Sequence, residues 1–524
     1  MHLKNMDMKN SNQKSKKLYS LLLVLIFGLA FFLRVMFLKD NSLTFGYDQA
    51  RDALVAKQIL SGDFKIQGPP SSQPGLFHGV LYYYLLAPAY YFGDGSPIFT
   101  AYYLAFLNSL TVLIVFFIAK LATKNNWIAL LSSFLFAVSF ESTQYATWLS
   151  NPTIAVWTVP LMYLGLWIWI NSNPKKISLL GPILSAIGLG LSTQAEIFLI
   201  YHIVPLLIWL FIFKKNVTKK SLIIFGTVFV IVISSLIVCE LKFGFNSLTA
   251  MKSLASGSGG NLAYAKSVGD YLILYLNQVG RIFAFNTYPG NIGYGGVAVI
   301  VLAIYSLTNF KRDKYGAFLS TWLFSHLTVV TVGGTSTPFL MVGIGPAVSL
   351  ILGYYIYKLF NKQVILSILV LIIIIYGNLS FVFFQNKLGS TLFSIQRDML
   401  LSKQIAAIDY TYKLAEGKPF SINSLTSPLW INIVWTYLYK WYGVEKYGYA
   451  PMWHGKDQIG QLDSLTRIEN PLEKSFLILE PMAGIPARYL GETIGEEDFD
   501  TVLVEEKSFG EIIVQSRKKV KTIN

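Results

Sequence analysis

Several side chains that could do acid–base or phosphate chemistry lie close together near the N-terminus: Asp48, Arg51, Asp52 and His78. The two carboxylates are four residues apart, so on a helix they share one face. Asp48 could take the proton of an acceptor hydroxyl as a general base, or it could cap the start of a helix, since Asp is a preferred N-cap residue. His78 could hold a phosphate, or it could be an interfacial residue next to the aromatic run that contains Tyr82.

Two short helices would position these residues. Apolar residues at helical spacing, with Asp48 at the start and Gly62 after the end, predict a surface helix over 48–60. After the irregular stretch 68–74, the Tyr-rich apolar run 77–88 is too short to span a bilayer and is typical of an interfacial or re-entrant helix.

The composition indicates that these two helices belong to a membrane protein. Of 524 residues, 53% are hydrophobic and only 14% are charged, whereas about a quarter of an average soluble domain is charged. About eleven apolar runs are long enough to span a bilayer. They lie near 18–37, 98–119, 127–148, 152–170, 178–193, 196–213, 221–240, 294–310, 316–333, 338–357 and 363–384.

The net charge of +15 gives an orientation. The N-terminal segment and every second loop are basic and together carry about +16, as the positive-inside rule requires of cytoplasmic segments. These loops contain Lys120 and Lys124; Lys175 and Lys176; Lys214, Lys215, Lys219 and Lys220; Lys311, Arg312 and Lys314; and Lys358 and Lys362. The charge is therefore a topology signal, and nucleic acid is excluded as a partner. We expect a multi-pass cell-membrane protein with a cytoplasmic N-terminus and an extracytoplasmic C-terminal domain.

The predicted domains are a basic cytoplasmic N-terminus (1–17), a transmembrane domain (18–384) and an extracytoplasmic α/β domain (385–524). The transmembrane domain carries the long outer loop 38–97 and a second, Gly-rich outer segment over 241–293. In the tail, we predict helices over 397–414 and 428–441 and strands over 420–422, 476–479, 501–504 and 512–514. The dense Trp and Tyr residues of the tail predict core packing, with sugar binding as an alternative.

Two further ionisable residues lie at predicted outer ends of spans. Glu196 follows Ser192-Thr193-Gln194, which indicates a break between two spans, and Arg281 is followed by Ile282-Phe283, close to the entry of a span. Such residues mark functional sites, although wet helix ends and snorkelling explain them equally well.

The order of features in the first outer loop resembles the GT-C superfamily of membrane glycosyltransferases. The narrower resemblance is to the branch with protein O-mannosyltransferases, lipid A aminoarabinose transferases and bacterial galacturonosyltransferases. Tyr47-Asp48-Gln49 stands where these proteins usually have Asp-Glu, and the run from Phe77 to Tyr82 stands where they have a Pro-Pro-Leu-Tyr-like motif. The fold class expected is thus an α-helical polytopic membrane protein, GT-C-like, with a small α/β C-terminal domain.

The resemblance implies a sugar donor on a polyprenyl phosphate, inversion at the anomeric carbon and Asp48 as the catalytic base. His78 would lie near the donor phosphate. Substrate-binding candidates are Tyr47, Gln49, Arg51, Asp52, His78, Tyr82, Glu196 and Arg281. Arg binds a phosphate leaving group well because its guanidinium is bidentate. Gln49 replaces the second acid, so no metal ligand is assigned and a requirement for a divalent cation stays open.

The main hypothesis is transfer of a hexosyl or pentosyl group from a polyprenyl-phosphate sugar to a hydroxyl of a protein, lipid or glycan at the extracytoplasmic face of the bilayer. Two alternatives remain. One is a polytopic transporter or flippase of lipid-linked sugars, against which the chain shows no clear internal repeat. The other is a lipid-linked polymer ligase. The sugar, the acceptor and the length of the lipid carrier have no sequence signature.

Overall fold

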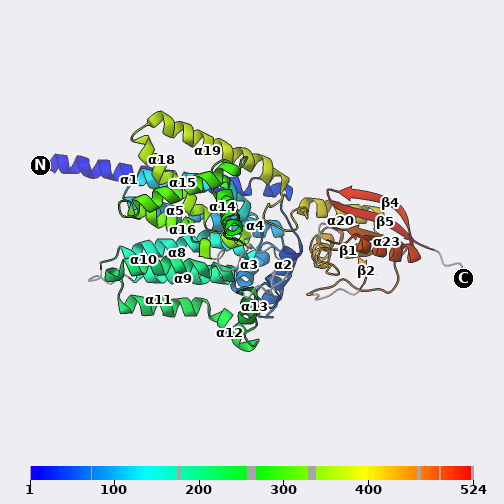
Figure 1. Ribbon diagram of the computed structural model, residues 1–524. Helices are drawn as coiled ribbons and strands as arrows, with labels where there is room; N and C mark the ends of the chain where they lie inside the picture. The colour runs from blue at the N-terminus through cyan, green and yellow to red at the C-terminus, as the bar shows by residue number, and fades with distance from the viewer. Residues whose placement is uncertain are drawn as a thin grey trace.

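The structure is a computed structural model that describes residues 2–71, 74–173, 179–255, 267–328, 338–456, 462–482 and 485–520. It consists of a helical body and a smaller α/β unit, with the two chain termini at opposite ends of the molecule (Figure 1). The predicted loop residues Lys175 and Lys176, and Gly257, Gly259 and Gly260 of the second outer segment, lie outside the described residues.

The helical body contains α1 (His2–Val35), α2 (Tyr47–Leu60), α3 (Leu81–Phe92), α4 (Pro97–Ser109), α5 (Thr111–Thr123), α6 (Asn126–Val138), α7 (Phe140–Ala146), α8 (Ala155–Ile170), α9 (Leu180–Ala195), α10 (Ile203–Ile212), α11 (Lys219–Val232), α12 (Ser234–Lys242), α13 (Asn246–Ala255), α14 (Val268–Phe285), α15 (Gly293–Asn309), α16 (Lys314–Leu323), α18 (Gly345–Phe360) and α19 (Val364–Gln385). Short 3₁₀ turns include η2 (Asn151–Ile154), η3 (Ile197–His202) and η5 (Pro338–Met341).

Each predicted span overlaps at least one of these helices. Within the described residues, four helical segments are long and apolar enough to cross a membrane: Lys16–Asp40, Pro97–Thr123, Asn151–Ile170 and Val364–Leu388. The pair α11–α12 qualifies as a fifth if it is one span bent by 56°. The remaining predicted spans coincide with shorter or broken helices, so the total of eleven stays a prediction.

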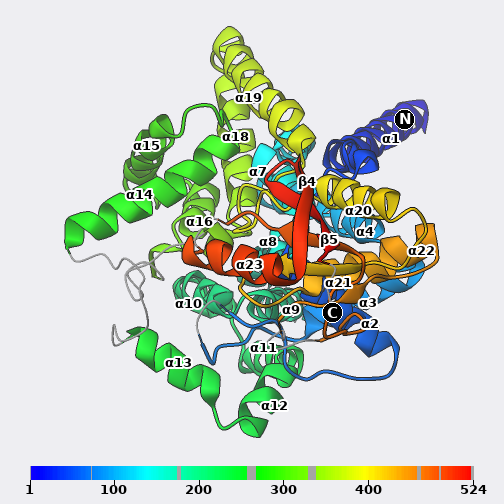
Figure 2. The ribbon, with the colours of Figure 1, turned by 90° about the vertical axis from the view of Figure 1, so that its right-hand side faces the viewer.

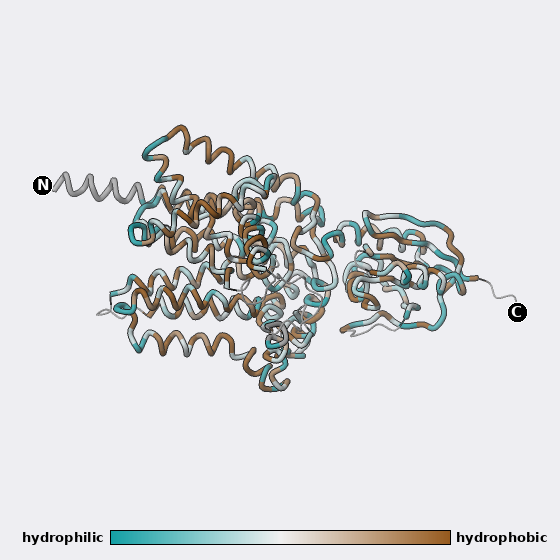
Figure 3. Tube along the Cα trace, viewed as in Figure 1, coloured by the Kyte–Doolittle hydropathy of each residue, from teal (hydrophilic) through white to brown (hydrophobic). Residues whose placement is uncertain are grey.

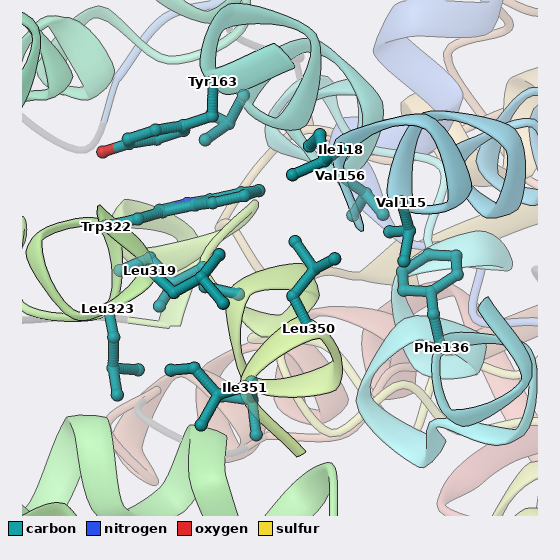
Figure 4. Close-up of a cluster of buried hydrophobic side chains, with 14 of the residues drawn as sticks. Val115, Ile118, Phe136, Val156, Tyr163, Leu319, Trp322, Leu323, Leu350 and Ile351 are labelled. Carbon is teal, nitrogen blue, oxygen red and sulfur yellow. The ribbon is translucent and has the colours of Figure 1, made fainter. Parts of the chain in front are cut away.

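The helices pack around an aromatic core and leave their outer faces apolar. Tyr163 of α8 stacks on Trp322 of α16, with ring centroids 4.1 Å apart, and Leu350 of α18 belongs to the same cluster (Figure 4). By contrast, only 22% of the apolar windows of α1 and α19 is buried. Figure 3 shows the hydrophobic character of these outer helices, which suits contact with lipid.

One predicted span, 127–148, is divided at Ser139. Its hydroxyl oxygen accepts a hydrogen bond from the Ser142 amide and caps α7. The break is locked by Arg34 of α1, which donates to the Asn108 amide oxygen at 2.7 Å and to the Ser142 hydroxyl at 2.7 Å. Arg34 also donates to the Ala137 carbonyl, so this buried cation ties α1, α4 and the α6–α7 break together.

The second outer segment differs from its prediction as a Gly-rich loop. Its described residues form α13 and the eighteen-residue helix α14. The N-terminus of α14 is fixed by a capping box, in which Ser267 and Asp270 bond each other's backbone amides. Arg281 is therefore carried by a helix.

The C-terminal unit is a five-stranded mixed sheet with the order β2-β1-β3-β5-β4. Its strands are β1 (Ser421–Leu425), β2 (Met452–Trp453), β3 (Lys474–Leu479), β4 (Thr501–Phe509) and β5 (Ile512–Lys519). Its helices are α20 (Leu401–Ala415), α21 (Ile433–Leu438), α22 (Val444–Tyr447) and α23 (Arg488–Asp500), with a π-helical turn over Tyr439–Gly443. β1, β2 and β3 are parallel, and β3, β5 and β4 are antiparallel. The predicted strands and the helices within 397–414 and 428–441 are confirmed.

The C-terminal unit and the first outer loop share one hydrophobic core. Trp435, Tyr437 and Tyr439 are almost fully buried in it, which confirms the predicted packing role of these aromatics. The ring of Tyr437 lies 5.6 Å from that of Phe45, just ahead of α2. The loop that carries the candidate base is thus packed between the helical body and the sheet.

Candidate active site

The start of α2 is defined by Gly46. The Gly46 amide donates to the Gln49 side-chain oxygen at 2.9 Å, and the Tyr47 amide donates to the Gln396 side-chain oxygen at 2.6 Å. Asp48 lies in the first turn and does not cap the helix, because Gly46 occupies the N-cap position. The Asp48 side chain is 53% exposed, so its carboxylate is accessible from solvent at the positive end of the helix dipole.

Arg51 joins the two carboxylates of the helix. Its Nη1 lies 2.7 Å from Asp48 Oδ1, and its Nη2 and Nε lie 2.6 and 2.9 Å from Asp52 Oδ1. The guanidinium also lies over the Tyr47 ring, 5.6 Å from its centroid. The side chains of Arg51 and Asp52 are almost fully buried. The buried Asp52 carboxylate thus fixes the Arg51 guanidinium, which in turn holds the exposed carboxylate of Asp48.

The buried members of this group have shifted pKa values. Burial raises the pKa of Asp52 to about 7, against the opposing effect of the Arg51 charge. Tyr82 is fully buried, and burial and the nearby Asp52 charge raise its pKa. Asp52 Oδ2 and the Tyr82 hydroxyl have no hydrogen-bond partner within the described part of the chain. The site therefore contains one exposed acid and a polar cluster shielded from water.

His78 and Glu196 meet beneath this helix. The loop before α3 is fixed by hydrogen bonds from the His78 amide to the Pro69 carbonyl and from the Gly79 amide to the Gln194 carbonyl. His78 Nδ1 lies 3.4 Å from Glu196 Oε1 and accepts from the Ile197 amide at 3.5 Å.

Burial and the Arg51 charge lower the pKa of His78 to about 3. The imidazole is therefore neutral, and its contact with Glu196 is not an ion pair. Glu196 lies between α9 and η3 in an extended backbone conformation, at the break that its sequence neighbours predict.

Arg281 lies on α14, away from this cluster; Figure 2 shows α14 and α2 on different sides of the C-terminal unit. Its guanidinium packs over Phe393 and Phe285, 5.3 and 5.7 Å from the ring centroids, and Nη2 donates to Gln278 at 3.3 Å. Nε and Nη1 are buried and make no hydrogen bond of good geometry among the described residues, although the Glu141 carboxylate and the Tyr145 hydroxyl lie close enough to interact with the guanidinium. Since an unpaired buried N–H is costly, these two donors indicate a place for an anion.

Two short segments connect Arg281 to the start of α2. Tyr145 stacks on Phe393 with centroids 4.5 Å apart, and the Leu149 carbonyl accepts from the Gln49 amide group at 3.1 Å. Phe393 and Gln396 are three residues apart, so their Cα atoms are separated by at most about 11 Å. These contacts link the Asp48 cluster and Arg281 through the segment 393–396, without direct contact between them.

Sequence reasoning missed Gln396, which binds the backbone of Tyr47. No local signal marks it, because it lies in a different predicted domain. The side chain of Gln49, a predicted substrate-binding residue, is hydrogen-bonded to the Gly46 amide and the Leu149 carbonyl. Within the described ranges, no group of three or more His, Cys, Asp or Glu side chains is placed to hold a metal ion.

The fold can be compared with known proteins. No protein-family model matches the sequence, and no curated protein matches it significantly. Among solved structures, ArnT from Cupriavidus metallidurans in the apo state is similar, with a TM-score of 0.59 and 8% identity over 96% of this chain and 98% of that chain. The same protein bound to undecaprenyl phosphate gives a TM-score of 0.56 and 9% identity over 95% and 98%.

A more distant likeness is to the Archaeoglobus fulgidus oligosaccharyltransferase in complex with Zn and sulfate. It has a TM-score of 0.48 and 13% identity over 76% of this chain and 55% of that chain. The match to ArnT extends over nearly the whole of both chains and includes the helical body and the C-terminal unit. The chain therefore has the fold of ArnT over nearly its whole length, in agreement with the resemblance that the first outer loop predicts.

Proposed function

We propose that the protein is a membrane glycosyltransferase that moves a sugar from a polyprenyl phosphate to a hydroxyl acceptor at the extracytoplasmic face. The observation that carries this proposal is the exposed Asp48 carboxylate, held by the buried Arg51–Asp52 pair. The whole-chain likeness to ArnT, which has been solved with undecaprenyl phosphate, supports the choice of donor class.

In the proposed reaction, Asp48 accepts the proton of the acceptor hydroxyl. The oxygen then forms a bond to C1 of the sugar, on the face opposite the phosphate. The bond from C1 to the phosphate oxygen breaks, and its electron pair leaves with the polyprenyl phosphate. Attack opposite the leaving group inverts C1, and a general base of this kind contributes about 10²–10⁴-fold to a rate.

Arg281 is the proposed ligand of the phosphate. It has two buried N–H donors that make no hydrogen bond of good geometry in the described chain, whereas the donors of Arg51 that bind Asp48 and Asp52 are already in use. A cation that meets the charge developing on the leaving phosphate stabilises the transition state. His78 is neutral, so toward a phosphate it could act only through a hydrogen bond.

We further propose that the N-terminus is cytoplasmic and that α2, α3 and the C-terminal unit lie outside. The basic loops support this orientation, as does the position of the N-terminus at the end of the molecule remote from the sheet (Figure 1). The acceptor is a protein, lipid or glycan hydroxyl, as the sequence analysis expects.

The test uses the full-length protein purified in detergent and a panel of polyprenyl-phosphate sugars. Mass spectrometry then measures released polyprenyl phosphate. Asp48→Asn should abolish release without changing the unfolding temperature. The matched control is Asp63→Asn, an exposed acid just after α2 that pairs only with Lys65 in the described structure. Full activity of Asp48→Asn would remove the assigned base, and counterflow in proteoliposomes without any release would favour a transporter.

A further inference from the structure

A second polar site lies in the C-terminal unit, on the sheet face covered by α23. Residues paired across strands point to the same face, so Ser475 of β3 and Arg517 of β5 lie side by side, with Asn423 of β1 close to them. At the other end of this face, Leu425 and Leu479 pack under α23. One half of a buried face is thus apolar and the other half is polar.

The polar half is organised around Glu497 of α23. Asn423 donates to Glu497 Oε1 at 2.6 Å, His454 Nε2 lies 3.1 Å from the same oxygen, and Arg517 Nε lies 4.0 Å from Oε2. Burial alone would raise the pKa of Glu497, but the hydrogen bonds from His454 and Asn423 lower it. Glu497 is therefore a carboxylate, and because a carboxylate only accepts, His454 Nε2 must carry the proton.

This assignment leaves the other ring nitrogen of His454 without a role. The His454 side chain is 5% exposed, and its buried Nδ1 has no hydrogen-bond partner in the described part of the chain. In an imidazole whose single proton is on Nε2, Nδ1 is a hydrogen-bond acceptor. A buried polar atom without a partner is costly, and it indicates a place for a donor that a ligand supplies.

His454 and Glu497 line a cavity of about 230 Å³. Its wall also contains the carboxylates of Glu469, Glu496 and Asp500, with Lys456 as a cation of the same wall. Lys456 lies 2.7 Å from Glu496, whereas no ion pair of Glu469 or Asp500 is found among the described residues. The wall is therefore net acidic and offers mostly acceptors, including the free nitrogen of His454.

We propose that this cavity binds a small molecule that carries a primary ammonium group. Such a group has three donors and a positive charge, which match the carboxylates of the wall and the buried, unpartnered Nδ1 of His454. The inference is independent of the proposed transferase reaction and of Asp48.

The test is isothermal titration calorimetry of the full-length protein in detergent. The probes are glucosamine for an amino sugar, putrescine for a free polyamine and glucose as the uncharged control. We expect saturable binding of at least one amine and none of glucose. Binding of glucosamine would indicate an amino sugar as the ligand, and binding of putrescine would indicate a free polyamine. No saturable heat with either amine at millimolar concentration, or equal binding of glucose and glucosamine, would overturn the proposal.

Two variants probe the wall without disturbing the packing under α23. Glu469→Gln/Asp500→Asn neutralises two exposed acids and should weaken amine binding about tenfold or more. Its matched control, Glu492→Gln/Glu511→Gln, neutralises two exposed acids that do not line the cavity and should bind as the parent does. Equal affinities of the two double variants would refute the site.

His454→Gln tests the ring nitrogen. The Gln amide nitrogen can replace Nε2 as the donor to Glu497, but no acceptor remains in the position of Nδ1. We expect an unchanged unfolding temperature and about tenfold weaker amine binding. Full affinity in this variant, with an unchanged unfolding temperature, would show that His454 serves only to hold α23.

Discussion

Replacement of Arg51 by Met should separate two roles of this residue, one in stability and one in catalysis. Arg51 is a cation between a buried acid and an exposed one, with 2% of the Asp52 side chain and 53% of the Asp48 side chain exposed. Removal of one partner of a buried ion pair costs about 3–5 kcal/mol when the other charge stays uncompensated. Asp52 has a pKa of about 7 even beside Arg51, so near pH 7 the variant protonates this acid, and the full cost is present only at higher pH. The exposed contact to Asp48 contributes at most about 1 kcal/mol. Measured at about pH 9, the expected loss in unfolding free energy is therefore about 3–5 kcal/mol, almost all of it from Asp52.

The double variant Arg51→Met/Asp52→Leu should recover most of that loss, because it removes the stranded acid and fills the space with an apolar side chain. Activity should behave differently. In both variants Asp48 loses the guanidinium that fixes its carboxylate, and a misplacement of about 1 Å can lower a rate about 100-fold. We expect release of polyprenyl phosphate to stay low in the double variant.

Chemical denaturation in a mild detergent, followed by tryptophan fluorescence, gives the stability, and the release assay gives the rate. A stable Arg51→Met variant, within about 1 kcal/mol of the parent at about pH 9, would refute the argument for a buried pair. Recovery of the parental rate in the double variant would refute the positioning of Asp48 by Arg51.

Two further predictions concern Arg281 and His78. Arg281→Gln should raise KM for the lipid-phosphate donor about tenfold or more, whereas Arg281→Lys should raise it less because it keeps the charge. Steady-state kinetics over a donor series would measure both values, and an unchanged KM would argue against a phosphate contact. His78 has a pKa of about 3 in the folded state, against an ordinary value of 6.5. Between these pH values the unfolded state binds more protons than the folded state, so the free energy of unfolding should fall as the pH drops below 6.5. His78→Asn should remove this component from denaturation curves measured between pH 7 and pH 4, and an identical pH dependence in the variant would contradict the neutral imidazole.

The elements that the sequence predicts well are those with local signals. The surface helix predicted over 48–60 is α2, because apolar spacing and a terminal glycine are both local. The strands 476–479 and 512–514 lie in β3 and β5, since short apolar runs between turns are equally local. The predicted break near Glu196 rests on local sequence and is also present.

The features that the sequence does not reveal depend on partners far along the chain. Ser139 divides a continuous apolar run, yet the division is held by Arg34, more than a hundred residues away. The sequence predicts a Gly-rich outer segment over 241–293, and the glycines in this segment obscure the helical pattern of α14. His454 has no metal-like spacing, and only the folded sheet brings it to Glu497.

The position of the candidate base follows from the C-terminal unit as much as from its own helix. The Phe45 amide donates to the Met399 carbonyl at 2.8 Å, and the Phe45 carbonyl accepts from Gln404 at 2.7 Å. Gln396 then binds the Tyr47 amide, one residue before Asp48. The chain on both sides of the N-cap is thus fixed by residues from the tail, while Arg51 and Asp52 fix the side chain from within the helix. Since catalytic groups must be held to within a fraction of an ångström, this arrangement gives the tail a direct part in the geometry of the proposed base.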